Sequence, residues 1–93
     1  MSVESTALGT LIGKQVVLDT NSHFVYLGAL KSLSEHFIEL GDVDVHDGSE
    51  SPTPKEIYII DSKKYGVKKN RNSVFVRASL VVSLSLLEDV IEY

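Results

Sequence analysis

The apolar residues of segment 37–45 change phase part-way along it, and this constrains the fold more than any other feature. Ile38 and Leu40 occupy even positions, whereas Val43 and Val45 occupy odd ones. Successive side chains of a β-strand face opposite sides, so one apolar face here needs an extra residue after Leu40. A β-bulge supplies that residue and bends the strand. The pattern therefore predicts a curved strand rather than one in a flat sheet.

The rest of the chain also favours short, bent strands. Gly28 interrupts the apolar segment 23–33, which predicts a bend or the close approach of another backbone at that point. A capping box, Thr53-Pro54-Lys55-Glu56, predicts a helix start, and 68–72 reads as a basic turn. We expect helices over 7–12 and 54–65, and strands around 16–18, 23–33, 37–45, 74–76 and 80–84. This order predicts a mainly β, strongly bent, five-stranded SH3-like barrel with an N-terminal helix and an inserted helix.

Length and composition bound what such a barrel can be. A chain of 93 residues is one domain that buries roughly 64% of its unfolded surface, so its core is modest and self-association is expected. The absence of cysteine excludes a disulfide scaffold and thiolate zinc sites. The apolar run 78–87 is about half a membrane span, and residue 4 is an acid where a signal peptide would be basic. We expect a cytoplasmic protein that contacts no membrane.

Charge is unevenly distributed along the chain. Residues 54–77 hold seven of the nine basic residues and two acids, a local charge of +5. The remainder holds two basic residues and eleven acids, a local charge of −9, and the sum is the net charge of −4. The overall charge therefore hides a basic segment on an acidic chain. Such a segment is either a solvated surface or a binding element.

Four segments together carry a resemblance to a known family. Segments 13–18, 26–30 and 38–43 resemble the first Sm motif of Sm and Sm-like (LSm) proteins, and 74–84 is similar to the second. The resemblance implies an N-terminal helix on a bent five-stranded barrel spanning 1–93. It also implies rings formed by the fourth strand of one copy and the fifth of the next. Residues 47–72 would be an insert between the third and fourth strands.

The resemblance also implies where single-stranded, uridine-rich RNA would bind. Arg77 matches the arginine of the second motif, and His36 falls where some relatives place a stacking histidine, with Phe37 beside it. Ser34 stands in place of the family aspartate and the asparagine that follows it in the family is absent, so base discrimination at this site is expected to be lost. Ala78 also stands in place of the glycine of the second motif. Other readings stay open: His36 as an exposed turn residue, and Arg77 as an ion-pair partner of Glu35 or of a neighbouring copy.

The expected insert offers a second set of candidates. Its basic side chains could bind RNA phosphates, with Tyr58 and Tyr65 nearby for stacking; they are Lys63, Lys64, Lys68, Lys69 and Arg71. Alternatively, these side chains meet an acidic run of another chain, Asp42, Asp44, Asp47 and Glu50. The sequence leaves both readings open.

No catalytic residue, cofactor or metal is expected. The three histidines, His23, His36 and His46, are 13 and 10 residues apart, which suits no helical metal pair. The sequence also lacks a phosphate-cradling glycine loop and a nucleophile motif. We therefore expect a ring-forming, RNA-binding protein that is not an enzyme. The alternative is a scaffolding ring that has lost the RNA site.

Overall fold

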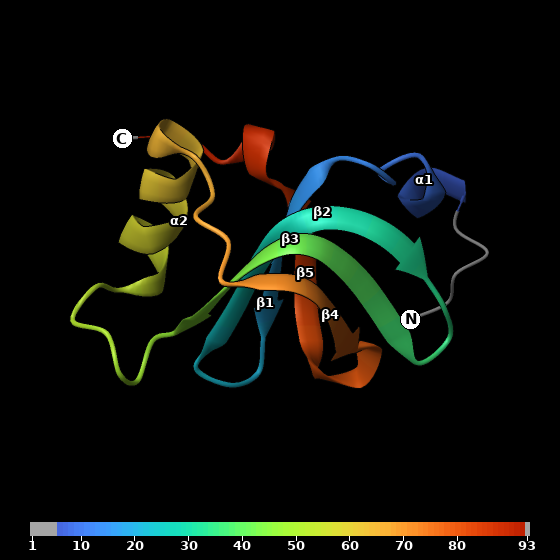
Figure 1. Cartoon of the computed structure of the whole chain (residues 1–93), viewed down its shortest axis with the longest axis horizontal. Helices are drawn as coiled ribbons and strands as arrows, with labels where there is room; N and C mark the ends of the chain where they lie inside the picture. The colour runs from blue at the N-terminus through green and yellow to red at the C-terminus, as the bar shows by residue number, and fades with distance from the viewer. Residues whose placement is uncertain (1–5, 93) are drawn as a thin grey trace.

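The computed structural model describes residues 6–92 and consists mainly of β-strands. Its elements in chain order are α1 Thr6–Gly9, β1 Gln15–Thr20, β2 Phe24–Leu33, β3 Phe37–Asp47, α2 Lys55–Tyr65, β4 Arg71–Arg77, the 3₁₀ turn η1 Ala78–Leu80, β5 Val81–Leu86 and the 3₁₀ turn η2 Leu87–Asp89. Helices α1 and α2 lie at opposite ends of the molecule (Figure 1). The predicted mainly β, bent, five-stranded fold is confirmed.

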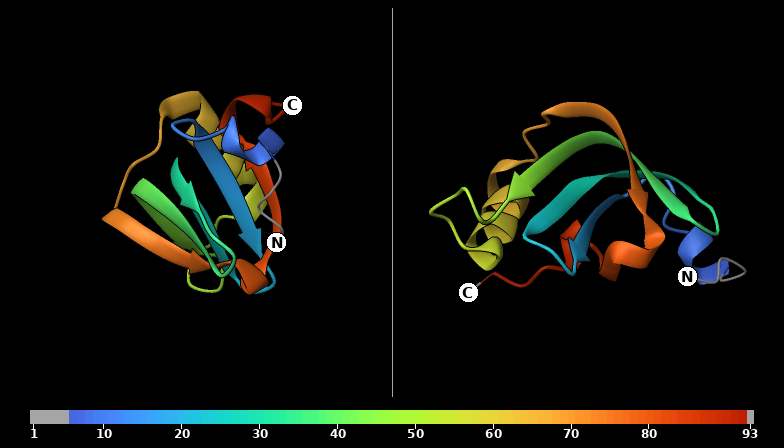
Figure 2. Two further views of the ribbon diagram at one scale, coloured as in Figure 1. Left: turned by 90° about the vertical axis from the view of Figure 1, so that its right-hand side faces the viewer. Right: turned by 90° about the horizontal axis from the view of Figure 1, so that it is seen from below.

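The strands form one antiparallel sheet in the order β4-β3-β2-β1-β5. The sheet arches strongly, as the view from below in Figure 2 shows. Strands β4 and β5 lie at its two edges. The described sheet is therefore a bent barrel that is not closed. Each edge strand keeps one row of backbone hydrogen-bonding groups free for another partner.

The bulge predicted in β3 is confirmed. Leu27 pairs with Asp44 and Ala29 with Gly41, so β3 contributes one residue more than β2 between these pairs. Asp42 has a positive φ of 49° and points to solvent. The extra residue lets β3 bury Leu40 on one side of the bulge and Val43 on the other. The phase change in the sequence therefore marks the point where β3 bends.

Gly28 of β2 lies opposite the bulge of β3, where the two strands bend together. It pairs with Val16 of β1 and faces the β3 bulge. A Cβ atom at Gly28 would lie 2.9 Å from the carbonyl oxygen of Gly41 and 3.2 Å from Val43 Cγ2. The predicted close approach of another backbone is confirmed, since a side chain would push β2 and β3 apart.

Two apolar clusters lie on opposite faces of the sheet. The inner cluster fills the concave face with Val16, Leu18, Leu30, Ile38, Leu40, Val43, Val76 and Ala78. The outer cluster, Val17, Val25, Leu27 and Leu87, is covered by α2 and by the end of the chain through Tyr58, Ile59, Val67 and Val90. Strands β1 and β2 are therefore buried on both faces where α2 lies.

Several predicted boundaries are wrong. Helix α2 begins after Pro54 with no side-chain cap hydrogen bond, so the Thr53–Glu56 capping box does not form. Arg71 and Asn72 belong to β4 rather than to a basic turn, because β4 still pairs with β3 beyond the bulge, where Val43 lies opposite Arg71. The connection between β3 and β4 is thus residues 48–70, inside the expected insert of 47–72.

The start of the chain is only partly described. Helix α1 has four residues, and turns follow it up to Gly13, whose φ is 93°. The two-turn helix expected over 7–12 is therefore longer than the helix present. The acid at residue 4 lies outside the described residues. Within 6–92, no helix has the length and apolar character needed to cross a membrane.

Candidate nucleic-acid interface

A tight turn between β2 and β3 holds the first candidate residues. The Ser34 backbone N–H donates to Phe37 O at 2.9 Å, and the Ser34 hydroxyl both donates to that oxygen and accepts from the Phe37 N–H, each at 3.1 Å. Ser34 thus fixes the turn with its own side chain. His36 projects from this turn into solvent.

A second turn, at the end of β4, lies directly against the first. Phe37 pairs with Arg77 across the two strands, and the Ala78 N–H donates to His36 O at 2.8 Å. The guanidinium carbon of Arg77 lies 5.3 Å from the centroid of the Phe37 ring. This is a cation–π contact at an exposed position, worth about 0.5–1 kcal/mol. The structure therefore brings together three predicted residues, His36, Phe37 and Arg77, hereafter the Phe37–Arg77 site.

Within one chain, Arg77 contacts Phe37 rather than forming the ion pair with Glu35 that the sequence suggested. Among the described residues, Arg77 has no salt bridge, and Glu35 is not its partner. Phe37 is 38% exposed and Arg77 is exposed. The two side chains are thus held against each other while part of each remains accessible to solvent.

The basic residues of the insert have different environments. Lys63 Nζ donates to Val90 O, and Lys64 forms an ion pair with Glu92 at 4.0 Å. Both lysines thereby fasten the C-terminal segment to α2. Lys69 forms an ion pair with Asp42 at 3.1 Å. The acidic partner that was expected on another chain is therefore a residue of the same chain.

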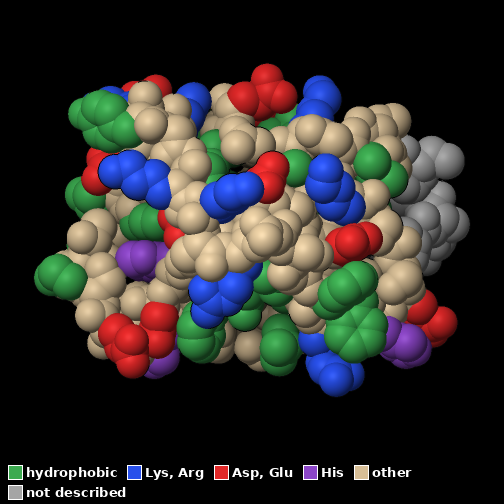
Figure 3. Space-filling model, viewed as in Figure 1, with side chains coloured by type: hydrophobic (Ala, Val, Ile, Leu, Met, Phe, Trp, Pro, Cys, Tyr) green, Lys and Arg blue, Asp and Glu red, His purple; other side chains and the backbone are tan. Residues whose placement is uncertain are grey.

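The other two insert candidates are freer. Arg71 donates to the carbonyl oxygen of Asn70 at 2.9 Å, and the exposed Lys68 has no partner among residues 6–92. On the face seen in Figure 3, blue and red side chains lie interspersed. The +5 segment thus does not form a continuous basic surface there, because three of its lysines, Lys55, Lys64 and Lys69, pair with acids from other parts of the chain.

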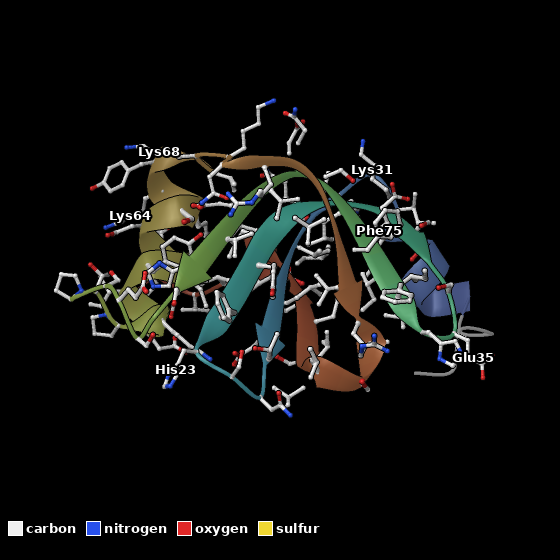
Figure 4. The ribbon with its side chains drawn as sticks, turned by 60° about the horizontal axis from the view of Figure 1, so that its bottom comes forward. His23, Lys31, Glu35, Lys64, Lys68 and Phe75 are labelled. Atoms are coloured by element: carbon white, nitrogen blue, oxygen red, sulfur yellow. The ribbon has the colours of Figure 1, made fainter. Side chains whose placement is uncertain are left out.

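The two candidate regions lie far apart in the molecule. Figure 4 places Glu35 of the β2–β3 turn at one end and Lys64 and Lys68 at the other, beside α2. The molecule is 37 Å long and 23 Å across. A single nucleotide therefore does not contact both regions of one chain.

A cavity beside α2 was not predicted from the sequence. Its volume is about 350 Å³, and it lies between β3, the 51–53 loop and α2. His46 of β3 stacks on Tyr58 of α2, with ring centroids 3.9 Å apart and planes 10° apart. Burial, with the neighbouring Asp44 carboxylate, raises the pKa of Tyr58 far above its ordinary value. Nothing in the spacing of these two residues indicated the contact, which depends on how α2 docks on β3.

A metal centre is not formed by the described residues. Within 6–92, no three histidine, aspartate or glutamate side chains lie close enough to hold a metal ion. His23, His36 and His46 are separate in the structure: His23 lies in the β1–β2 turn, His36 in the β2–β3 turn and His46 under α2.

The fold is similar to that of several solved structures. An Sm protein of Pyrococcus abyssii, solved in complex with a uridine heptamer, is 16% identical, with a TM-score of 0.60 over 87% of this chain and 93% of that one. A heptameric archaeal Sm protein is 25% identical, with a TM-score of 0.59 over 88% and 97%. The SmAP (LSm) protein of Methanococcus vannielii is 20% identical, with a TM-score of 0.59 over 92% and 100%.

Sequence comparison alone does not reach this result. No family model matches the chain, and no curated protein sequence does. The likeness lies in the bent antiparallel sheet and its strand order, and it extends over nearly the whole of each Sm protein compared. The chain therefore has the fold of the archaeal Sm proteins.

Proposed function

We propose that this chain forms a ring and binds single-stranded RNA at the Phe37–Arg77 site, without catalysing a reaction. The observation that carries the proposal is the guanidinium of Arg77 held over the Phe37 ring, both exposed and joined by backbone pairing. Arginine planes and aromatic rings are the surfaces on which proteins stack unpaired bases. Such stacking contributes about 1–3 kcal/mol per base.

The site is built for stacking more than for reading base edges. The Ser34 hydroxyl is engaged with the backbone of Phe37, so it has little capacity left for a base. His36 supplies the remaining polar group of the site. We therefore expect affinity for single strands with a weak preference among bases. The uridine heptamer bound by the Pyrococcus abyssii protein supports the class of ligand.

Ring formation is supported by the two sheet edges. Phe75 on β4 is 63% exposed and Val82 on β5 is 64% exposed. A heterologous contact that pairs β4 of one copy with β5 of the next satisfies both edges and buries both side chains. The archaeal relative described as heptameric supports such an assembly. In a ring, several Phe37–Arg77 sites would act on one strand, so weak single contacts would add up.

A ring without RNA is the second candidate. Two observations favour it: Ser34 stands where the resemblance expects an aspartate, and the chain carries a net charge of −4. A negatively charged ring repels a polyanion, and only local contacts offset that repulsion. The RNA-binding experiment separates this candidate from the first.

The test is the binding of a fluorescently labelled oligouridine, followed by anisotropy. The wild type is measured at about 50 mM and about 200 mM salt, because phosphate contacts weaken with salt through counterion release. Arg77→Ala is expected to lower affinity about tenfold, the equivalent of one lost stacking contact. Arg71→Ala makes the same chemical change at the start of β4 and is expected to cost less.

Two results would contradict the proposal. Absence of binding by the wild type at low salt would leave the scaffolding ring as the function. An equal loss in the Arg71→Ala and Arg77→Ala variants would show that affinity arises from charge alone and that the Phe37–Arg77 site is not where RNA binds.

A further inference from the structure

The cavity beside α2 lies at the end of the molecule opposite the Phe37–Arg77 site. Lys64 and Lys68 mark that end in Figure 4, and Glu35 marks the other. A volume of about 350 Å³ falls within the range of about 300–1,000 Å³ typical of small-molecule pockets. The cavity is thus large enough for a ligand and distinct from the proposed RNA site.

The inner wall of this cavity has unmet hydrogen-bonding capacity. The stacked rings of His46 and Tyr58 form that wall. His46 Nε2 and Tyr58 Oη are both buried and have no hydrogen-bond partner in the described chain. Buried polar atoms without a partner are rare in folded proteins and unfavourable. Because neither atom is exposed to solvent, a ligand in the cavity would pack against the two rings rather than bond to these atoms.

The mouth of the cavity carries three side chains that the rest of the chain leaves unpaired. Among residues 6–92, the Asp61 carboxylate and the Lys68 ammonium have neither an ion pair nor a hydrogen bond. The Tyr65 side chain is 75% exposed and lines the same cavity. Lys63, Lys64 and Lys69, by contrast, are engaged within the chain. Three free groups of the insert therefore lie on this cavity.

We infer that this cavity binds a nucleotide whose base carries an exocyclic amino group. The Tyr65 ring offers a stacking surface, and the unpaired Asp61 carboxylate accepts hydrogen bonds from the amino group. Asp44 also lines the cavity, where one of its oxygens already accepts from Asn70 Nδ2 at 3.1 Å. Lys68 offers a positive charge for the phosphate. Adenine, cytosine and guanine carry such an amino group, whereas uracil carries none and offers one ring N–H between two carbonyl oxygens that a carboxylate repels.

An organic cation is a less suitable occupant. It would suit the carboxylates and the aromatic wall but would meet the like charge of Lys68. A nucleotide uses the ring, the carboxylates and the lysine together. The ligand is either a free nucleotide or a nucleotide of a single strand, and the two sources share this chemistry.

The test is a titration of the full-length chain with AMP, CMP and UMP, followed by amide chemical shifts in NMR spectra. The inference predicts shifts at amides around the cavity, such as Ser62 and Gly66, with AMP and CMP. UMP should bind about tenfold more weakly, the equivalent of one hydrogen bond to a charged group. Equal affinity for UMP, or shifts confined to the Phe37–Arg77 site, would overturn it.

Variants assign the base preference to a particular side chain. Asp61→Asn keeps an acceptor and adds a donor, so the preference for AMP over UMP should disappear while binding remains. Asp89→Asn makes the same change on η2, outside the cavity, and should leave the preference intact. A preference retained in Asp61→Asn would show that Asp61 does not read the base.

A stacking variant and strands of defined sequence complete the test. Tyr65→Ala should weaken AMP binding about tenfold, as loss of one stacking contact does, whereas Ile57→Ala on the same helix should not. Binding of oligoadenosine tighter than that of AMP indicates a strand as the source, and equal binding indicates a free nucleotide. The inference is independent of the RNA site, since AMP binding is expected to persist in Arg77→Ala and even if oligouridine does not bind.

Discussion

Replacement of Gly28 by alanine tests the origin of the bend in the sheet. The added methyl group would lie 2.9 Å from the Gly41 carbonyl oxygen and 3.3 Å from Val43 Cα. Both neighbours are backbone atoms of the β3 bulge, so they give way only if β2 and β3 separate. The backbone of Gly28 does not itself require glycine, because it lacks a positive φ. The expected effect is therefore one of space alone.

Two opposing contributions set the change in the free energy of unfolding caused by Gly28→Ala. Excess volume in a packed core costs about 1–3 kcal/mol, while loss of glycine's freedom in the unfolded chain returns about 0.4–1 kcal/mol. The net expectation is a loss of about 1–2 kcal/mol in the free energy of unfolding. For a domain of this size, the melting temperature should fall by about 5–15 °C.

Two further glycine variants calibrate the result, measured by urea and thermal unfolding with circular dichroism. Gly41→Ala would contact Lys31 Cε, but that side chain can move away, so the loss of stability should be small. Gly9→Ala meets nothing within 4 Å and should be neutral or slightly stabilising. If Gly28→Ala were as stable as Gly9→Ala, the bend would not depend on close approach at Gly28.

Three other predictions concern the cavity, the ring and α2. Tyr58→Phe removes an unpartnered buried hydroxyl and should stabilise the fold by about 1 kcal/mol at neutral pH. Since folding raises the Tyr58 pKa, the wild type should also lose stability as pH rises above about 10, where the unfolded chain releases this proton; urea titrations in which the two proteins show parallel pH curves would refute this. Val82→Asp should leave a folded monomer of 10.2 kDa in light scattering, while Ile57→Asp, exposed on α2, should keep the assembly. Lys55→Met removes the ion pair with Asp19 at 2.9 Å. Because the pair is partly exposed, the free energy of unfolding should fall by no more than about 1 kcal/mol. A larger loss in urea unfolding would refute this estimate.

The bend of the sheet could be predicted because its signals are local. The shift from even to odd apolar positions in β3 and the glycine in β2 each reflect the backbone on which they lie. The start of α2 could not be predicted in the same way. The motif around Thr53 matched a capping box, but Lys55 contacts Asp19 and the carbonyl oxygen of Ser22, so docking on the β1–β2 end positions the first turn.

Contacts of the candidate site could be predicted only where the two residues lie on strands that pair with each other. Phe37 and Arg77 meet because β3 and β4 pair in register, and a motif in each strand pointed to that position. The partners of Lys63 and Lys69 depend instead on where the C-terminal segment and the β3 bulge lie in three dimensions. The contact of His46 with Tyr58 likewise appears only once α2 packs on β3.

Native mass spectrometry of the full chain with excess oligouridine tests the central claim most directly. It reports the number of copies in the assembly and the RNA bound to it in one spectrum. The proposed function predicts a closed assembly whose mass is a multiple of 10.2 kDa and increases by that of one RNA strand. A monomer, or an assembly that takes up no RNA, would contradict it.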